Sequence, residues 1–181
     1  MLSTAMLPIL LLFAVMFNQI YAPLSRLPGE FAPDIALMVA LFGGVVYTPW
    51  PATALGFGAG LLQDTLTGGL LGVGALSKGL TGLLWARLWR QIVSETALSQ
   101  LPLLALLTTV DGATFFGASI LFSRHHPGWD TFFPLLGRQL LSNLVLGPLV
   151  LMLFMALHRK LKRPKRFGWR RNDSAITFEP E

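Results

Sequence analysis

Apolar residues gather in long runs that short polar or proline-containing segments separate. The first run extends from about Leu2 to Tyr21, and the second begins at Ile35 and continues almost to Leu62. An α-helix needs about 20 residues to cross a hydrocarbon core of about 30 Å, so such runs predict membrane-spanning helices. The second run is too long for one crossing. TPWP at residues 48–51 interrupts it, and because proline ends or kinks a helix, we expect two helices at about 34–50 and 51–66.

Three further apolar runs complete the pattern. They predict helices at about 70–88, 99–122 and 134–157, and the proline-containing residues 22–33 form a connection. The sequence thus predicts an all-α membrane protein, a single bundle of about six transmembrane helices over residues 1–158. A basic, partly disordered tail at 159–181 would follow. A five-span version, in which the second and third helices merge or re-enter the membrane, stays open.

Composition supports the membrane class and removes several enzyme classes. The 181 residues are 53% hydrophobic and 13% charged, whereas a soluble domain has about 25% charged residues. The absence of cysteine excludes disulfides, a thiol nucleophile and thiolate metal ligands. The three histidines lack the i, i+4 spacing of a zinc helix, and no serine lies in a G-x-S-x-G motif. We therefore expect no metal, no cofactor and no enzymatic activity.

Basic residues are concentrated after the last apolar run. Cytoplasmic ends of spans are rich in Lys and Arg, so this cluster predicts a cytoplasmic C-terminus and, with six spans, a cytoplasmic N-terminus. Cations directly after a span favour contact with anionic lipids over binding of nucleic acid. The residues of this lipid-facing tail are Arg159, Lys160, Lys162, Arg163, Lys165 and Arg166.

Four charged residues lie in or beside the predicted spans. An isolated charge in lipid costs at least about 2.5 kcal/mol, so these residues should pair with one another or face water. Lys78 and Asp111 lie near the middles of successive helices and could pair inside the membrane. Asp64 ends the third helix and Arg138 begins the sixth, so these two could pair near the outer surface. The charges could form structural bridges or line an ion or substrate pathway.

Small residues recur at a helical spacing in the third and fourth helices. Small residues at i and i+4 let helix backbones approach closely in lipid, so they predict packing faces, either within the chain or against a partner. In the last helix, Ser142 and Asn143 predict a hydrogen bond between helices. The small residues form three pairs at this spacing: Gly56 and Gly60, Gly68 and Gly72, and Ala75 and Gly79.

The segment at about 33–90 carries a family resemblance. Pro33-Asp34 opens the apolar run IALMVALFGGV, and GFGAGLLQDTLTGGLLGVGAL follows. Within it, D-x-L-x-G-x-x-x-G-x-x-A-L resembles a pattern of the MreD family of rod shape-determining membrane proteins. Its matching positions are Asp64, Leu66, Gly68, Gly72, Ala75 and Leu76.

The resemblance implies a non-catalytic scaffold in the bacterial inner membrane. Such a protein would bind the bitopic protein MreC and act with MreB, RodA and a penicillin-binding transpeptidase in lateral peptidoglycan synthesis. An exposed small-residue face, including the fourth helix, would bind the MreC span, and Gly72→Leu would weaken that complex by adding bulk.

The same resemblance supplies a rival function. MreD-like folds are similar to the substrate-binding S components of energy-coupling-factor vitamin transporters, in which polar groups would line a vitamin pocket. The few polar residues within the predicted helices disfavour this alternative. A channel or secondary transporter would show an internal repeat, which the sequence lacks.

Overall fold

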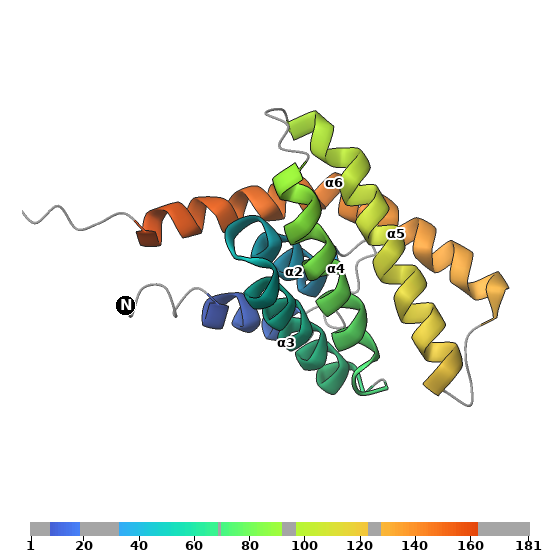
Figure 1. The fold of residues 1–181 in the computed structure, drawn as a ribbon. Coiled ribbons are helices and arrows are strands. Elements are labelled where there is room, and N and C mark those ends of the chain that lie inside the picture. The colour runs from blue at the N-terminus through green and yellow to red at the C-terminus, as the bar shows by residue number, and fades with distance from the viewer. Residues whose placement is uncertain (1–7, 19–32, 69, 92–96, 123–127, 163–181) are drawn as a thin grey trace, which may run out of the picture.

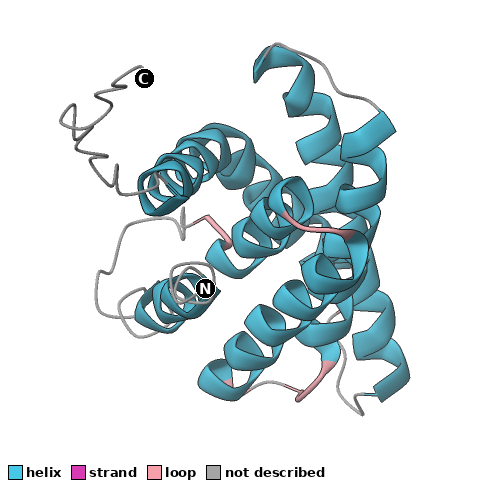
Figure 2. Ribbon diagram, turned by 60° about the vertical axis from the view of Figure 1, so that its left-hand side comes forward, coloured by secondary structure: helices cyan, strands magenta, loops and turns pink. Residues whose placement is uncertain are grey.

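The computed structural model describes residues 8–18, 33–68, 70–91, 97–122 and 128–162, and these form six helices (Figure 1). Every described element in Figure 2 is a helix or a short loop, so the predicted all-α class is confirmed. The helices are Pro8–Asn18, α2 (Ile35–Val46), α3 (Pro49–Thr67), α4 (Val73–Gln91), α5 (Ala97–Phe122) and α6 (Trp129–Lys162).

Length and composition single out two of the described helices as candidate membrane spans. They are Leu101–Phe122, within α5, and Trp129–Leu161, within α6. The 12 residues of α2 extend over only about 18 Å, which is less than the thickness of the hydrocarbon core. The observed helix α2 is therefore shorter than the helix predicted at 34–50.

The short helix α2 occupies the centre of the structure. All of residues 36–44 are buried, and α2 contacts α3, α4 and α6. A helix that is apolar on every side suits such an enclosed position. Around it pack Trp85 of α4, Phe154 of α6, and Leu11 and Val15 of the N-terminal helix. The core of the molecule thus surrounds α2.

The break between α2 and α3 falls at the TPWP sequence, slightly earlier than predicted. Thr48 takes the N-cap position of α3, and Pro49 and Pro51 lie in the first turn of that helix. Proline is tolerated there because the first backbone N–H groups of a helix have no partner within the helix. The two prolines therefore begin α3, where we had expected them to separate two helices between residues 50 and 51.

Helix α6 is longer than predicted and crosses the whole molecule (Figure 1). It continues through Pro134 and Pro148 and reaches Lys162, beyond the expected end at residue 157. Arg159 and Lys160, assigned to the basic tail, are exposed residues of its last turns. The other tail residues, Arg163, Lys165 and Arg166, lie outside the described part of the chain.

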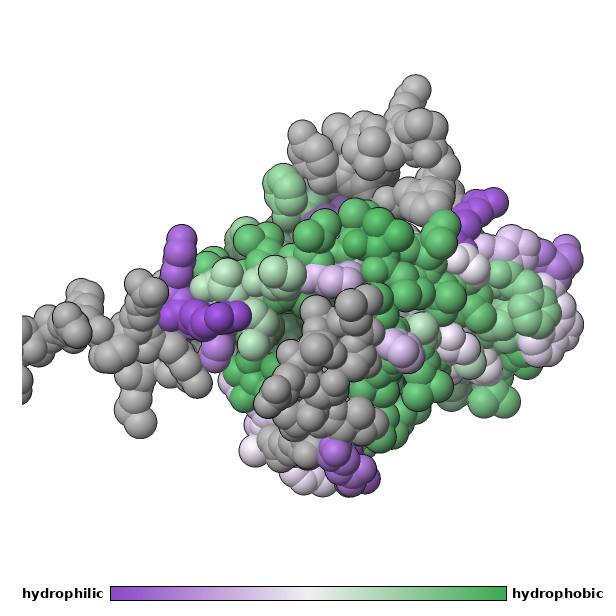
Figure 3. All heavy atoms as spheres, turned by 90° about the horizontal axis from the view of Figure 1, so that it is seen from above, coloured by the Kyte–Doolittle hydropathy of each residue, from purple (hydrophilic) through white to green (hydrophobic). Residues whose placement is uncertain are grey.

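On the face that Figure 3 shows, the described residues are largely apolar, and the strongly hydrophilic ones lie toward its margins. Large side chains stand exposed along α6, including Phe133 and Leu149 at 63% each and Leu153 at 66%. Exposed apolar area of this extent marks a surface that contacts lipid or another protein.

Candidate functional site

Lys78 of α4 forms a buried ion-pair triad with two carboxylates. Its Nζ lies 3.0 Å from Asp34 Oδ2 and 3.5 Å from Asp111 Oδ2. The three side chains expose only 4%, 11% and 2% of their surface, for Lys78, Asp34 and Asp111. The contact between Lys78 and Asp111 is as predicted from their positions in successive helices. The participation of Asp34 was missed.

Asp34 reaches the triad because it is the N-cap of α2. Its Oδ1 accepts a hydrogen bond from the backbone N–H of Leu37 at 3.0 Å, which fixes the side chain at the start of the helix. The other oxygen, Oδ2, then points to Lys78. An Asp directly before an apolar run is a typical N-cap signal, and this signal could have identified Asp34.

Helix α6 contributes two amides to the same region. The Nε2 group of Gln139 lies 3.4 Å from Oδ2 of Asp34 and 3.4 Å from Oδ2 of Asp111. The side chain of Asn143 accepts the backbone N–H of Asp34 at 3.0 Å and donates to Oγ1 of Thr108 at 3.5 Å. These two amides are four residues apart and so share one face of α6.

We call Asp34, Lys78, Thr108, Asp111, Gln139 and Asn143 the polar core. It joins α2, α4, α5 and α6 through hydrogen bonds and ion pairs. The predicted hydrogen bond between helices is thus made by Asn143. Its neighbour Ser142 is also buried, but its Oγ has no hydrogen-bond partner in the described residues.

Asp64 performs a different task from the one predicted. It is 5% exposed, and its two oxygens accept backbone N–H groups of Gly72 at 2.8 Å, Gly74 at 3.0 Å and Ala75 at 3.3 Å. These donors lie at the start of α4, where backbone N–H groups have no partner within the helix. The structure therefore gives Asp64 backbone partners where we expected Arg138. Arg138 lies on the exposed side of α6, well inside that helix.

Gly56 and Gly60 bring the backbones of α3 and α4 into contact. A Cβ added at Gly56 would overlap the carbonyl oxygen of Lys78, and one at Gly60 would overlap the carbonyl of Gly74. Ala75 is fully buried in the same region. The predicted packing face therefore lies inside the chain, between α3 and α4.

The remaining predicted glycines have other roles. Gly68 and Gly72 have φ angles of 67° and 98°, and a Cβ added at either would meet nothing within 4 Å. They permit the left-handed backbone of the turn between α3 and α4. A Cβ at Gly79 would make an ordinary contact with Phe57, at 3.4 Å. A substitution at Gly72 therefore strains this turn, and the predicted effect of Gly72→Leu on a partner contact stays a prediction.

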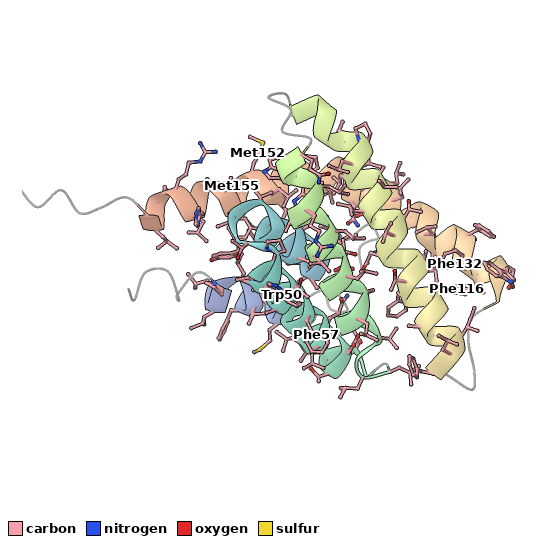
Figure 4. The ribbon with its side chains drawn as sticks, viewed as in Figure 1. Trp50, Phe57, Phe116, Phe132, Met152 and Met155 are labelled. Carbon is pink, nitrogen blue, oxygen red and sulfur yellow. The ribbon has the colours of Figure 1, made fainter. Side chains whose placement is uncertain are left out.

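Aromatic side chains gather where α5 ends and α6 begins. Phe116 stacks on Phe132 with ring centroids 4.2 Å apart, and Trp129 lies against both. Figure 4 shows Phe116 and Phe132 side by side at this end, far from Trp50 and Phe57 on α3. Trp50 is 80% exposed. Tryptophan is enriched where a span meets the lipid headgroups, which suits both positions.

A family model described as rod shape-determining protein MreD matches residues 1–161. No curated protein and no solved structure matches. Within the described residues, no group of three or more His, Cys, Asp or Glu side chains could hold a metal ion.

Proposed function

This chain belongs to the MreD family of rod shape-determining membrane proteins, and on that premise we propose that it is a non-catalytic scaffold of bacterial cell elongation. The family match over residues 1–161 is the observation that carries the proposal. In this role the protein holds an MreC-like bitopic partner and supports lateral peptidoglycan synthesis. MreB, RodA and a penicillin-binding transpeptidase are the further members of the proposed assembly.

The internal use of the polar and small residues supports a scaffold. Lys78 is neutralised by carboxylates of its own chain, Asp64 binds the backbone of α4, and the close glycine contacts join α3 to α4. These groups stabilise the fold. Binding of a partner then falls to the apolar outer surface.

We place the MreC-like span against the outer face of α6. In the apolar stretch that makes α6 a candidate span, only 22% of the residues are buried, compared with 44% in α5. Helix α6 therefore offers the larger exposed apolar surface. Leu141, Val145, Leu149 and Met152 follow one another along this face and are 52–68% exposed. An apolar partner helix fits such a stripe.

The proposed topology has six helices inserted in the inner membrane and both termini in the cytoplasm; α2, too short to cross the hydrocarbon core by itself, lies enclosed among its neighbours. The exposed Arg159 and Lys160 at the end of α6 support it, because Lys and Arg are concentrated at cytoplasmic span ends. They would hold anionic lipid headgroups together with the basic residues that follow.

The first test is purification of the tagged, full-length protein from native membranes in mild detergent, with mass spectrometry of the proteins that accompany it. We expect the MreC-like protein and cell-wall synthases. Recovery of paired ATPases and a coupling subunit in their place would contradict the scaffold and identify a vitamin transporter.

Cysteine cross-linking tests the position of the partner. The chain contains no cysteine, so each single-cysteine variant reports one site. We expect Leu149→Cys on α6 to cross-link to a cysteine in the partner span, and Phe57→Cys on α3 to remain unlinked. Both side chains are exposed, at 63% and 43%, so accessibility alone would label both. Cross-linking at Phe57 alone would move the interface to α3.

A further inference from the structure

The charges of the polar core do not balance when all of its carboxylates are ionised. In the described residues, the salt bridges of this region join one ammonium, Lys78, to two carboxylates, Asp34 and Asp111. Gln139 and Asn143 add only neutral amides. Full ionisation would leave one negative charge buried, and a buried unpaired ion costs far more than a buried neutral polar group.

The two carboxylates have different surroundings. Asp34 Oδ2 lies 3.0 Å from the ammonium of Lys78, and its Oδ1 accepts a backbone N–H at the positive end of the α2 dipole. Asp111 Oδ2 lies 3.5 Å from the ammonium. Its other oxygen, Oδ1, is buried and has no hydrogen-bond partner in the described residues. The stronger stabilisation of a negative charge is therefore at Asp34.

We propose that the polar core is a binding site for one proton and that Asp111 holds it. Lys78 and Asp34 form the ionised pair, and Asp111 is a neutral carboxylic acid with its proton on Oδ1. Oδ2 of Asp111 still accepts from Lys78 and Gln139, as the distances require. The polar core is then neutral. This inference does not depend on the proposed partner.

Proton binding here would control how α5 is attached. The groups that face Asp111 are Ser77 and Lys78 from α4, Asp34 from α2 and Gln139 from α6. Loss of the proton would leave two carboxylates to share the single ammonium of Lys78 and the Gln139 amide, and their repulsion would weaken the attachment of α5 to α2. The bound proton therefore keeps α5 joined to the buried centre of the fold.

Paired asparagine variants test the assignment. Asparagine resembles a protonated aspartic acid: its carbonyl can replace Oδ2 and its amide group can replace the protonated Oδ1. We expect Asp111→Asn to match the wild type in folded yield and melting temperature. Asp34→Asn should lower the folded yield, because it removes the nearer partner of Lys78 and forces Asp111 to give up its proton and pair with Lys78 at the longer distance of 3.5 Å. Equal loss in both variants, tolerance of both, or the reverse pattern would overturn the proposal.

Infrared spectroscopy of the purified, full-length protein gives a second readout. We expect the wild type at neutral pH to show the C=O stretch of a protonated carboxylic acid, and Asp111→Asn to lack it. The control is Asp130→Asn at an exposed position of α6, which should leave the band unchanged. A wild-type spectrum without the band, or a band that persists in Asp111→Asn, would refute the proton site.

Discussion

The α3–α4 pair and the α5–α6 pair are each two helices joined by a short connection, yet they are held together differently. Gly56 and Gly60 let α3 meet the backbone of α4 directly. In the α5–α6 pair the contacts come from side chains, such as the stacked rings of Phe116 and Phe132. Backbone contact leaves no room for added atoms, whereas side-chain contact can adjust.

The two pairs also differ in how they depend on charge. Asp64 binds backbone groups within the α3–α4 pair, whereas α5 and α6 are linked to the rest of the fold through Asp111, Gln139 and Asn143. We therefore expect added volume to disrupt the α3–α4 pair, and altered charge to disrupt attachment of the α5–α6 pair.

Removal of the central cation should have the largest effect. Lys78→Met leaves Asp34 buried without its ionic partner, which costs about 3–5 kcal/mol for buried pairs. Folded yield and thermal unfolding in detergent would measure the loss. A melting temperature equal to that of the wild type would show that the polar core does not attach α5 and α6.

Exchange of the Lys78 and Asp111 charges tests how much Asp34 contributes to the ion-pair triad. For an isolated pair, the double variant should recover all of the protein level that either single variant loses. Asp34 changes this expectation, because the exchange places a carboxylate where Lys78 contacts Asp34 at 3.0 Å. We expect partial recovery, measured as folded protein in membranes. Complete recovery would show that Asp34 contributes little.

Added volume at the α3–α4 contact should have the next largest effect. Gly60→Ala places a methyl group against the carbonyl of Gly74, and overpacking of this kind costs about 1–3 kcal/mol. Gly58→Ala, on the same helix, meets nothing within 4 Å and should be neutral or slightly stabilising. Thermal unfolding of the two variants checks the difference. Equal melting temperatures for the two variants would show that α3 and α4 do not depend on close backbone contact at Gly60.

Loss of the Asp64 carboxylate should be milder. Asp64→Ala removes the acceptor of three backbone N–H groups at the start of α4, and loss of a helix cap costs about 0.5–2 kcal/mol. The exposed neighbour Thr65→Ala is the control and should stay within about 0.5 kcal/mol. Unfolding of both variants in the same detergent compares them. A smaller loss for Asp64→Ala than for Thr65→Ala would contradict this role.

Gly72→Ala tests the turn. Its φ of 98° is unfavourable for a residue with a Cβ, at a cost of about 1–2 kcal/mol. Because the added Cβ meets nothing within 4 Å, the amount of partner recovered per folded molecule should not change. Co-purification with the MreC-like protein measures this ratio. If less partner is recovered per folded molecule while stability stays normal, Gly72 contacts the partner.

The smallest effect on stability should come from the outer face of α6. Leu149 is 63% exposed, so Leu149→Ala should change stability by no more than about 0.5 kcal/mol. Phe154 is 7% exposed on the same helix, and Phe154→Ala should cost about 3–5 kcal/mol. Thermal unfolding compares the two. Similar losses would mean that α6 is enclosed on both sides.

Hydropathy located the helices well because long apolar runs have few alternatives to helix in a chain of this composition. It could not give the length of α2. The run from Ile35 to the TPWP sequence is apolar throughout, and the helix within it ends where Tyr47 turns extended. Similarly, α6 extends past its apolar run because polar residues such as Arg159 and Lys160 can continue a helix at its exposed end.

The candidate site was predicted only where residue type and position pointed to one partner. Lys78 and Asp111 are opposite charges inside successive apolar runs. Asp34 lies before its run, so hydropathy did not place it among the buried charges. We expected Asp64 to pair with Arg138, because the sequence gives no sign of which backbone N–H groups are free to bind a carboxylate. The shared spacing of Gly56–Gly60 and Gly68–Gly72 likewise could not separate a helix contact from a turn.

The short distance along the chain between Asp64 and its partners bears on synthesis. Gly72, Gly74 and Ala75 follow Asp64 by eight, ten and eleven residues, so the carboxylate meets its donors almost as soon as α4 begins to form. Helices α3 and α4 can therefore leave the translocation machinery as one unit whose acidic residue is already satisfied. Lys78 can meet Asp34 in the same interval, because Asp34 has already been made. Asp111 follows Lys78 by 33 residues, so it joins the site after Lys78 and Asp34 have been made.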